Sequence, residues 1–123
     1  MKWLEAEQAL RECFPILEKT QPDVWTTYYV QAMLGNALLN QKKFTEAEPH
    51  LVSGYEGMKE RFDKLPDKNP SRPAVQQRIS ESLDRLIQLY NALDKPDQVK
   101  KYQELRAKYQ TAKELAPMPR PAK

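Results

Sequence analysis

Two residue types with reactive side chains occur once each in this sequence, as His50 and Cys13. A histidine can act as a general base when a nucleophile and an orienting partner lie beside it. The residues around His50 supply no such pair, so we interpret it as an ordinary helix-surface or interface residue. A single cysteine also excludes an internal disulfide framework, which favours a reducing, cytoplasmic setting.

Two pairs of glutamates look like the paired carboxylates of an acid–base site: Glu5 with Glu7, and Glu46 with Glu48. Side chains two residues apart on a helix point in different directions, so neither pair converges on one substrate atom. We expect these residues instead to cap helices and to interact with the helix dipole in the first turn. In particular, Thr45 and Glu48 have the spacing of a capping box.

Basic residues near the end of the chain could contact the phosphates of a nucleic acid. Glu104 and Glu114 interrupt them and the formal net charge is only +3, so we favour a solvated helix face and predict no nucleic-acid partner. Glycine-rich phosphate loops, Cys/His sets with metal spacing and a Ser/His/Asp set are missing from the sequence. We therefore predict a protein that is not an enzyme and that needs no cofactor or metal. The basic residues are Lys100, Lys101, Arg106, Lys108 and Lys113.

Apolar residues recur at helical spacing along most of the chain, which predicts an all-α domain. The composition agrees, with 3 glycines and 40% hydrophobic residues. No apolar run approaches the roughly 18 residues of a membrane helix, and the first residues lack the apolar core of a signal peptide. We expect a helical domain over residues 1–115 and a disordered, proline-rich tail over 116–123. The predicted helices run from Trp3 to about Lys19, Val24 to Gln41, Thr45 to Lys64, Pro73 to Leu93 and Asp97 to Leu115.

Parts of the sequence repeat at a fixed distance. The segment that starts at Trp3 matches the segment that starts at Phe44, and each matched pair is 41 residues apart. Cys13 matches Gly54 in this register, which predicts a buried, inert thiol at a packing position. The next repeat has a spacing of 52 residues, and the 11 additional residues fit a longer helix and a proline-rich loop over 65–73. The chain is therefore expected to consist of the second helix of one unit followed by two helix pairs.

The most specific motif combines a glycine inside an apolar helix with a second helix that begins after a short polar turn: Leu34-Gly35-Asn36-Ala37-Leu38, then Phe44, Glu46-Ala47-Glu48 and Leu51. This motif resembles the tetratricopeptide (TPR) helix–turn–helix, most closely the kinesin-light-chain-like subtype. The phrase Ala47-Glu48-Pro49-His50-Leu51 with Gly54-Tyr55-Glu56-Gly57-Met58 also resembles the C-terminal repeats of large bacterial proteins, some of which carry a Ser/Thr kinase domain. The TPR resemblance covers residues 3–112. It implies an all-α helix–turn–helix solenoid of five helices, half a repeat plus two repeats, in which Gly35 lies against the next helix or its neighbour.

TPR arrays bind peptides on a concave face that the first helix of each repeat lines. The resemblance therefore implies a non-catalytic protein- or peptide-binding scaffold that is part of a longer protein. Asn36, Asn40 and Asn91 could pair with a peptide backbone as donors and acceptors, although amides that only face water are equally common. Glu81 and Asp84 favour basic or neutral segments over acidic carboxylate termini. Carried onto this sequence, the inner face holds Tyr29, Ala32, Asn36, Leu39, Asn40, Glu81, Asp84, Gln88 and Asn91.

A purely structural role is the alternative, in which the repeats join neighbouring repeats or a second copy and bind no free peptide. An open groove would favour peptide binding, and a groove filled by protein would favour the structural role. The first helix also lacks the partner helix of its own repeat. Because Trp3, Phe14 and Leu17 spread around more than one side of this helix, we expect two large aromatic residues to be exposed. Residues 1–20 are therefore predicted to pair with another protein surface, either a second copy in a homodimer or the preceding repeat of a longer parent protein.

Overall fold

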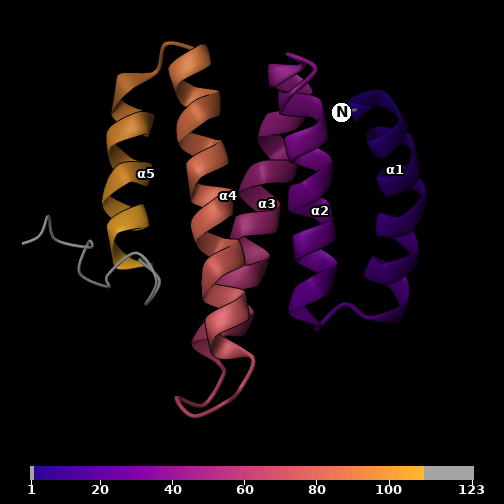
Figure 1. Cartoon of the computed structure of the whole chain (residues 1–123), viewed down its shortest axis with the longest axis vertical. Helices are drawn as coiled ribbons and strands as arrows, with labels where there is room; N and C mark the ends of the chain where they lie inside the picture. Colours follow the sequence, from indigo (N-terminus) through magenta and orange to yellow (C-terminus); the bar gives the residue numbers. More distant parts are fainter. Residues whose placement is uncertain (1, 110–123) are drawn as a thin grey trace, which may run out of the picture.

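The computed structural model describes residues 2–109 as five α-helices without a β-strand (Figure 1), which confirms the all-α prediction. None of these helices is both long and apolar enough to cross a membrane. Residues 110–115 of the last predicted helix and the predicted tail over 116–123 lie outside the described residues. The helices are α1 (Trp3–Thr20), α2 (Trp25–Leu39), α3 (Phe44–Asp63), α4 (Arg72–Ala92) and α5 (Pro96–Lys108).

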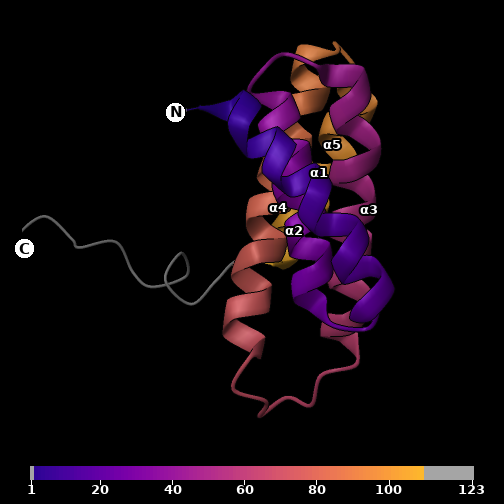
Figure 2. The ribbon, with the colours of Figure 1, turned by 90° about the vertical axis from the view of Figure 1, so that its right-hand side faces the viewer.

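Each helix packs against the next one in the chain, and α2 also contacts α4. The connections alternate between the two ends of the molecule, so successive helices run in opposite directions (Figure 1). Turned by 90°, the structure shows α2 and α4 on one side and α3 on the other (Figure 2). The α2–α3 pair has the most extensive contact, and α1 packs against α2 of this pair. Sequential packing of this kind brings α1, α2 and α4 around one hollow.

The turns after α2 and α4 have the same backbone structure. Lys42 and Asp94 adopt the left-handed conformation, with φ of 63° and 55°. In each turn the N–H of the following residue donates to a carbonyl five residues earlier, that of Leu38 at 3.0 Å and that of Tyr90 at 2.9 Å. This is the hydrogen-bond pattern of a Schellman helix end. The two turns lie 52 residues apart, so the spacing read from the sequence also holds in the backbone.

Gly35 allows α2 and α3 to approach each other closely. A Cβ atom built on Gly35 would lie 2.7 Å from Leu51 Cγ and 2.9 Å from the backbone nitrogen of Leu51. Real Cβ atoms do not come so close, so the contact requires glycine. The prediction that Gly35 faces the next helix is confirmed. Side chains that are almost completely buried surround this contact and continue to α4: Leu34, Leu38, Leu51, Met58, Ile79, Leu83 and Leu86.

The helix starts differ from the capping predictions. Helix α3 begins at Phe44 with Lys43 at its N-cap, and no side chain caps it. Thr45 and Glu48 therefore do not form the predicted capping box. Glu48 instead accepts a 2.7 Å hydrogen bond from the Tyr90 hydroxyl of α4. A partner on another helix competes successfully with the local N–H groups, because this bond also satisfies the hydroxyl of a buried tyrosine.

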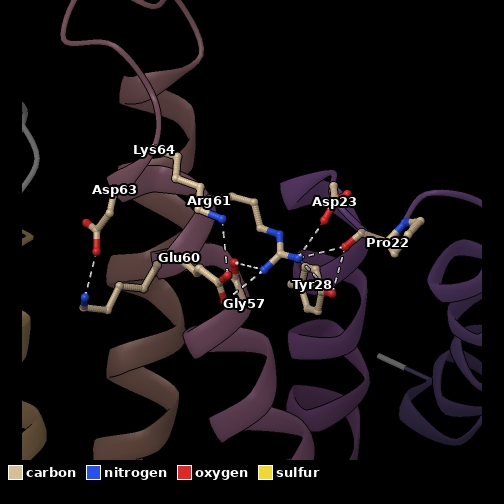
Figure 3. Close-up of polar contacts among 9 residues, drawn as sticks. Pro22, Asp23, Tyr28, Gly57, Glu60, Arg61, Asp63 and Lys64 are labelled. Carbon is tan, nitrogen blue, oxygen red and sulfur yellow. Dashed lines mark hydrogen bonds and ion pairs between the residues drawn. The ribbon is translucent and has the colours of Figure 1, made fainter.

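Arg61 of α3 forms hydrogen bonds with the turn before α2 (Figure 3). Arg61 donates from Nη2 to the Pro22 carbonyl at 3.0 Å and to Asp23 Oδ1 at 3.4 Å. Its Nη1 donates to the carbonyl of Gly57 at 3.4 Å. Asp23 thus bonds with α3 rather than with its own helix, whose N-cap is Val24.

Helix α1 buries a different set of side chains from the predicted one. Phe14 is only 9% exposed and Trp3 is half-buried. The prediction that α1 exposes two large aromatic residues is therefore wrong. Cys13, predicted to be buried, is exposed. Its counterpart Gly54 is buried because α2 covers that face of α3, and in the described residues no helix covers the same face of α1. The large apolar side chains that α1 exposes are Leu4 and Ile16.

Candidate functional site

A pocket of about 380 Å³ lies between α1, α2 and α4. This volume is within the range of roughly 300–1,000 Å³ that small-ligand sites occupy. The pocket is open to solvent on one side, so a ligand could enter without a movement of the helices. Its wall consists of Trp3, Ala6 and Leu10 from α1; Tyr29, Ala32, Met33, Asn36 and Ala37 from α2; and Arg78, Glu81, Ser82 and Arg85 from α4.

One wall of the pocket is apolar. On α2, Tyr29 and Met33 are four residues apart, so their side chains lie on one face of the helix. Trp3 and Leu10 of α1 also line the pocket. Aromatic and aliphatic surfaces of this kind can bind an apolar side chain of a ligand without specifying its sequence closely.

Helix α4 contributes charged side chains to the pocket. Arg78 Nη1 donates to Glu81 Oε1 at 3.1 Å, and its guanidinium carbon lies 4.9 Å from the centroid of the Tyr29 ring. The hydrogen bond with Glu81 raises the pKa of Arg78. Arg85 makes no ion pair or hydrogen bond with residues 2–109. The charges of Arg78 and Glu81 cancel, and the pocket therefore has a surplus positive charge on Arg85.

An amide pair at the end of α2 orients Asn36. Asn40 Nδ2 donates to Asn36 Oδ1 at 2.9 Å and to the carbonyl of Asn36 at 2.8 Å. The acceptor oxygen of the Asn36 amide is therefore occupied. Its Nδ2 group has no acceptor in the described part of the chain. Asn36 of α2 thus offers a donor to the pocket, as Arg85 of α4 does.

The residues predicted to line the inner face fall into two groups. Of these, Tyr29, Ala32, Asn36 and Glu81 line the pocket. The others lie elsewhere: Leu39 in the core at 3% exposure, Asn40 behind Asn36, Asp84 in an ion pair with Arg106 of α5 at 2.9 Å, and Gln88 and Asn91 on exposed parts of α4 beyond the pocket.

Leu39 was predicted to lie on the open inner face, but it is buried in the core, and the packing of α2 explains why. Helix α2 packs against α1, α3 and α4, so very little of its surface remains for an open face. Sequence reasoning also missed Arg78 and Arg85 and the part of the wall that α1 supplies. The spacing of Arg78, Glu81 and Arg85, three and then four residues, would have placed both arginines beside Glu81 on one helix face.

A second polar cluster surrounds Glu7, which is only 7% exposed. Its carboxylate accepts hydrogen bonds from Arg11 at 2.8 Å, from Gln41 at 2.8 Å and from Lys43 at 3.1 Å. These partners, Arg11 above all, lower the pKa of Glu7 from 4.5 to about 2. The cluster joins α1 to the end of α2, so Glu7 has a structural role across helices rather than the predicted role in the dipole of its own helix.

His50 is half-buried, and its Nδ1 atom has no hydrogen-bond partner in the described residues. Burial, followed by the nearby charge of Arg11, lowers the pKa of His50, so the imidazole is neutral near pH 7. It does not line the pocket between α1, α2 and α4. Within residues 2–109, no group of three or more His, Cys, Asp or Glu side chains could hold a metal ion.

No protein-family model, curated protein or solved structure matches this chain. The geometry of the pocket is therefore the basis for the functional argument.

Proposed function

We propose that this chain is a TPR-like helical module that binds an extended protein segment, without catalysis, in the pocket between α1, α2 and α4. The repeated helix ends at Lys42 and Asp94, the close contact at Gly35 and the sequential packing of the helices support the architecture. The pocket carries the functional part of the proposal, because it combines an apolar wall with two hydrogen-bond donors that have no partner in the described chain.

The chemistry of the pocket suggests what the bound segment contains. An apolar side chain would pack between Trp3 and Tyr29. A carboxylate or backbone carbonyl would accept from Arg85 and Asn36. The expectation that acidic segments bind poorly rested on Glu81 and Asp84, and both are neutralised by arginines at 3.1 and 2.9 Å. We therefore expect acidic segments to bind better than basic ones.

The structural alternative has its own supporting observation. Helix α1 exposes Ile16 and Cys13 on a face that α2 covers in the related helix α3. An association through that face would leave the pocket open, so the two functions are compatible. Apart from Ala6, they involve different residues, so they can be tested separately.

Peptide binding is tested with a library of seven-residue peptides displayed on phage and selected on the immobilised chain. Selected peptides should contain an apolar residue near an acidic one, and their affinities are then measured by fluorescence polarisation. Arg85→Glu should weaken binding by about tenfold or more, because it replaces an attraction by a repulsion in a partly enclosed site. Lys100→Glu makes the same charge change at an exposed position of α5 and should leave affinity within about twofold.

NMR titration locates the bound peptide. The side-chain amide of Asn36 and the indole of Trp3 should shift with the selected peptide. A library that yields no binding peptide, or peptides whose affinity Arg85→Glu leaves unchanged, would contradict the proposal. Basic peptides that bind more tightly than acidic ones would overturn the assignment of the ligand charge.

A further inference from the structure

Helices α1 and α3 are related by the 41-residue repeat, but their surroundings differ on one face. On α3 this face carries Gly54 and Gly57, and α2 covers both. A Cβ atom at Gly54 would lie 2.8 Å from the backbone nitrogen of Ala32. The matching residues of α1 are Cys13 and Ile16, which are exposed. The face of α1 that corresponds to the α2–α3 contact is therefore not covered by any of the described helices.

This face of α1 forms an uncharged stripe. Its members, here called the α1 stripe, follow one another at spacings of 3, 4, 3 and 4 residues, the spacing of a helix–helix seam. Ile16, its largest member, is 63% exposed. The hydroxyl of Thr20 donates to the Ile16 carbonyl at 2.7 Å and is thereby satisfied within the helix. The α1 stripe consists of Ala6, Ala9, Cys13, Ile16 and Thr20.

The helix that covers the α1 stripe cannot pack as α2 packs on α3. In that contact the ring of Tyr28 lies where a Cβ atom of Gly57 would be. Ile16 stands at the matching position of α1 and would overlap such a ring. The α1 stripe instead suits a partner that offers small and aliphatic side chains at a wider separation, as the stripe itself does.

The charges beside the α1 stripe favour a second copy in the antiparallel orientation. Glu5, Glu12 and Lys19 lie seven residues apart along one edge of the stripe. In a parallel two-fold pair this edge of each helix would face the other edge of the partner's stripe, so these three residues would not meet one another. In an antiparallel pair Glu5 of each chain lies beside Lys19 of the other, so two attractive pairs flank a single Glu12 contact. Ala6 and Ala9 then pack against Ile16 and Cys13 of the other copy.

We propose that two copies of this chain associate through the α1 stripe, antiparallel and around a two-fold axis. The contact is isologous, with the same surface on both chains. It involves one face of a single helix, so it is a weak interface by the usual standard of area. The pocket between α1, α2 and α4 and the α1 stripe are separate surfaces that share only Ala6 at their edge.

The association is measured by sedimentation equilibrium of the full chain, in reducing buffer, between about 10 and 500 µM because contacts of this size are weak. The wild-type mass should approach that of a dimer as concentration rises. Ile16→Glu should abolish this rise. Leu4→Glu is the matched control, since Leu4 is a large exposed side chain of the same helix, 53% exposed, that lies outside the α1 stripe. It should dimerise as wild type does, and circular dichroism confirms that both variants are folded.

A charge exchange tests the orientation. Glu5→Lys and Lys19→Glu should each weaken the dimer by about threefold to tenfold, and the double variant should restore it. A wild-type chain that stays monomeric throughout the concentration range, or Leu4→Glu that disrupts the dimer as strongly as Ile16→Glu, would overturn the proposal. A double variant weaker than both single ones would also overturn it. Arg85→Glu should leave the mass unchanged, so a failure of peptide binding does not decide this test.

Discussion

The guanidinium carbon of Arg61 lies 4.3 Å from the centroid of the Tyr28 ring. Arg61 belongs to α3 and Tyr28 to the first turns of α2, and the same guanidinium bonds with the turn that leads from α1 into α2. The tyrosine hydroxyl also donates to the Pro22 carbonyl at 2.8 Å. One stacked pair thus positions three segments: α3, α2 and the turn before α2.

Arg61→Met tests this connection. Methionine keeps most of the aliphatic stem but removes the stacking and the hydrogen bonds, so the free energy of unfolding should fall by about 1–3 kcal/mol. Lys64→Met is the control, because the Lys64 side chain is 75% exposed and its ion pair with Glu60 spans 3.5 Å. That change should be nearly neutral. Urea unfolding followed by circular dichroism measures both, and equal losses would contradict the proposed connection.

Gly57→Ala should destabilise the chain although alanine favours helices. The intrinsic gain in a helix is about 1 kcal/mol. The new Cβ atom would lie 2.9 Å from the Cβ atom of Tyr28 and would overlap its ring, at a cost of about 1–3 kcal/mol, so a net loss is expected. Ser53→Ala, at an exposed site of the same helix, should not destabilise it. Thermal unfolding of both variants checks the sign, and a higher midpoint for Gly57→Ala would refute the close packing.

The left-handed backbone at Lys42 predicts a stabilising substitution. A residue with a Cβ atom in this conformation is strained by about 1–2 kcal/mol relative to glycine. Lys42→Gly should therefore raise the free energy of unfolding by about 1 kcal/mol, whereas Lys42→Ala, which removes the same side chain but keeps the Cβ atom, should not. Chemical denaturation of the pair separates the backbone effect from the loss of the lysine charge. Equal stability of the two variants would count against strain in the backbone at Lys42.

Glu7 should make stability depend on pH in the acid range. Its pKa is lowered in the folded chain from 4.5 to about 2 by Arg11, Gln41 and Lys43. A carboxylate with a depressed folded pKa stabilises the fold above its unfolded pKa, and that contribution is lost as the pH falls from about 4.5 towards 2. The difference in unfolding free energy between wild type and Glu7→Gln should therefore shrink over this range. A difference that is constant between pH 6 and about 2.5 would show that Glu7 is not held ionised by these partners.

Local patterns in the sequence predicted the helices well because each helix buries a stripe with regular spacing. The steps from Val75 through Ile79 and Leu83 to Leu86 place four almost completely buried side chains on one face of α4. Gly35 was also placed correctly, since a glycine weakens an apolar helix unless a neighbouring helix must come close there. These features depend on residues that are close together in the chain.

Contacts between distant helices were predicted less well. Glu48 looked like part of a capping box, yet it bonds with Tyr90, 42 residues away. Cys13 was assigned to the core by analogy with Gly54, but burial there depends on a covering helix, which the local sequence does not reveal. The pocket is a further example, because Trp3 and Arg85 come from helices that only the folded arrangement brings to the same cavity.

Among the described helices, α1 packs against α2 alone, yet it supplies one wall of the pocket. Separation of α1 from α2 would break the Glu7 cluster and would leave the contacts among α2, α3 and α4 in place. Amide hydrogens of α1 should therefore exchange with solvent through local openings that cost less free energy than global unfolding. Each such opening removes Trp3, Ala6 and Leu10 from the pocket, so the proposed binding site is complete only in the fraction of molecules in which α1 is docked. A ligand that contacts this wall would slow exchange along α1 without changing the exchange of α4.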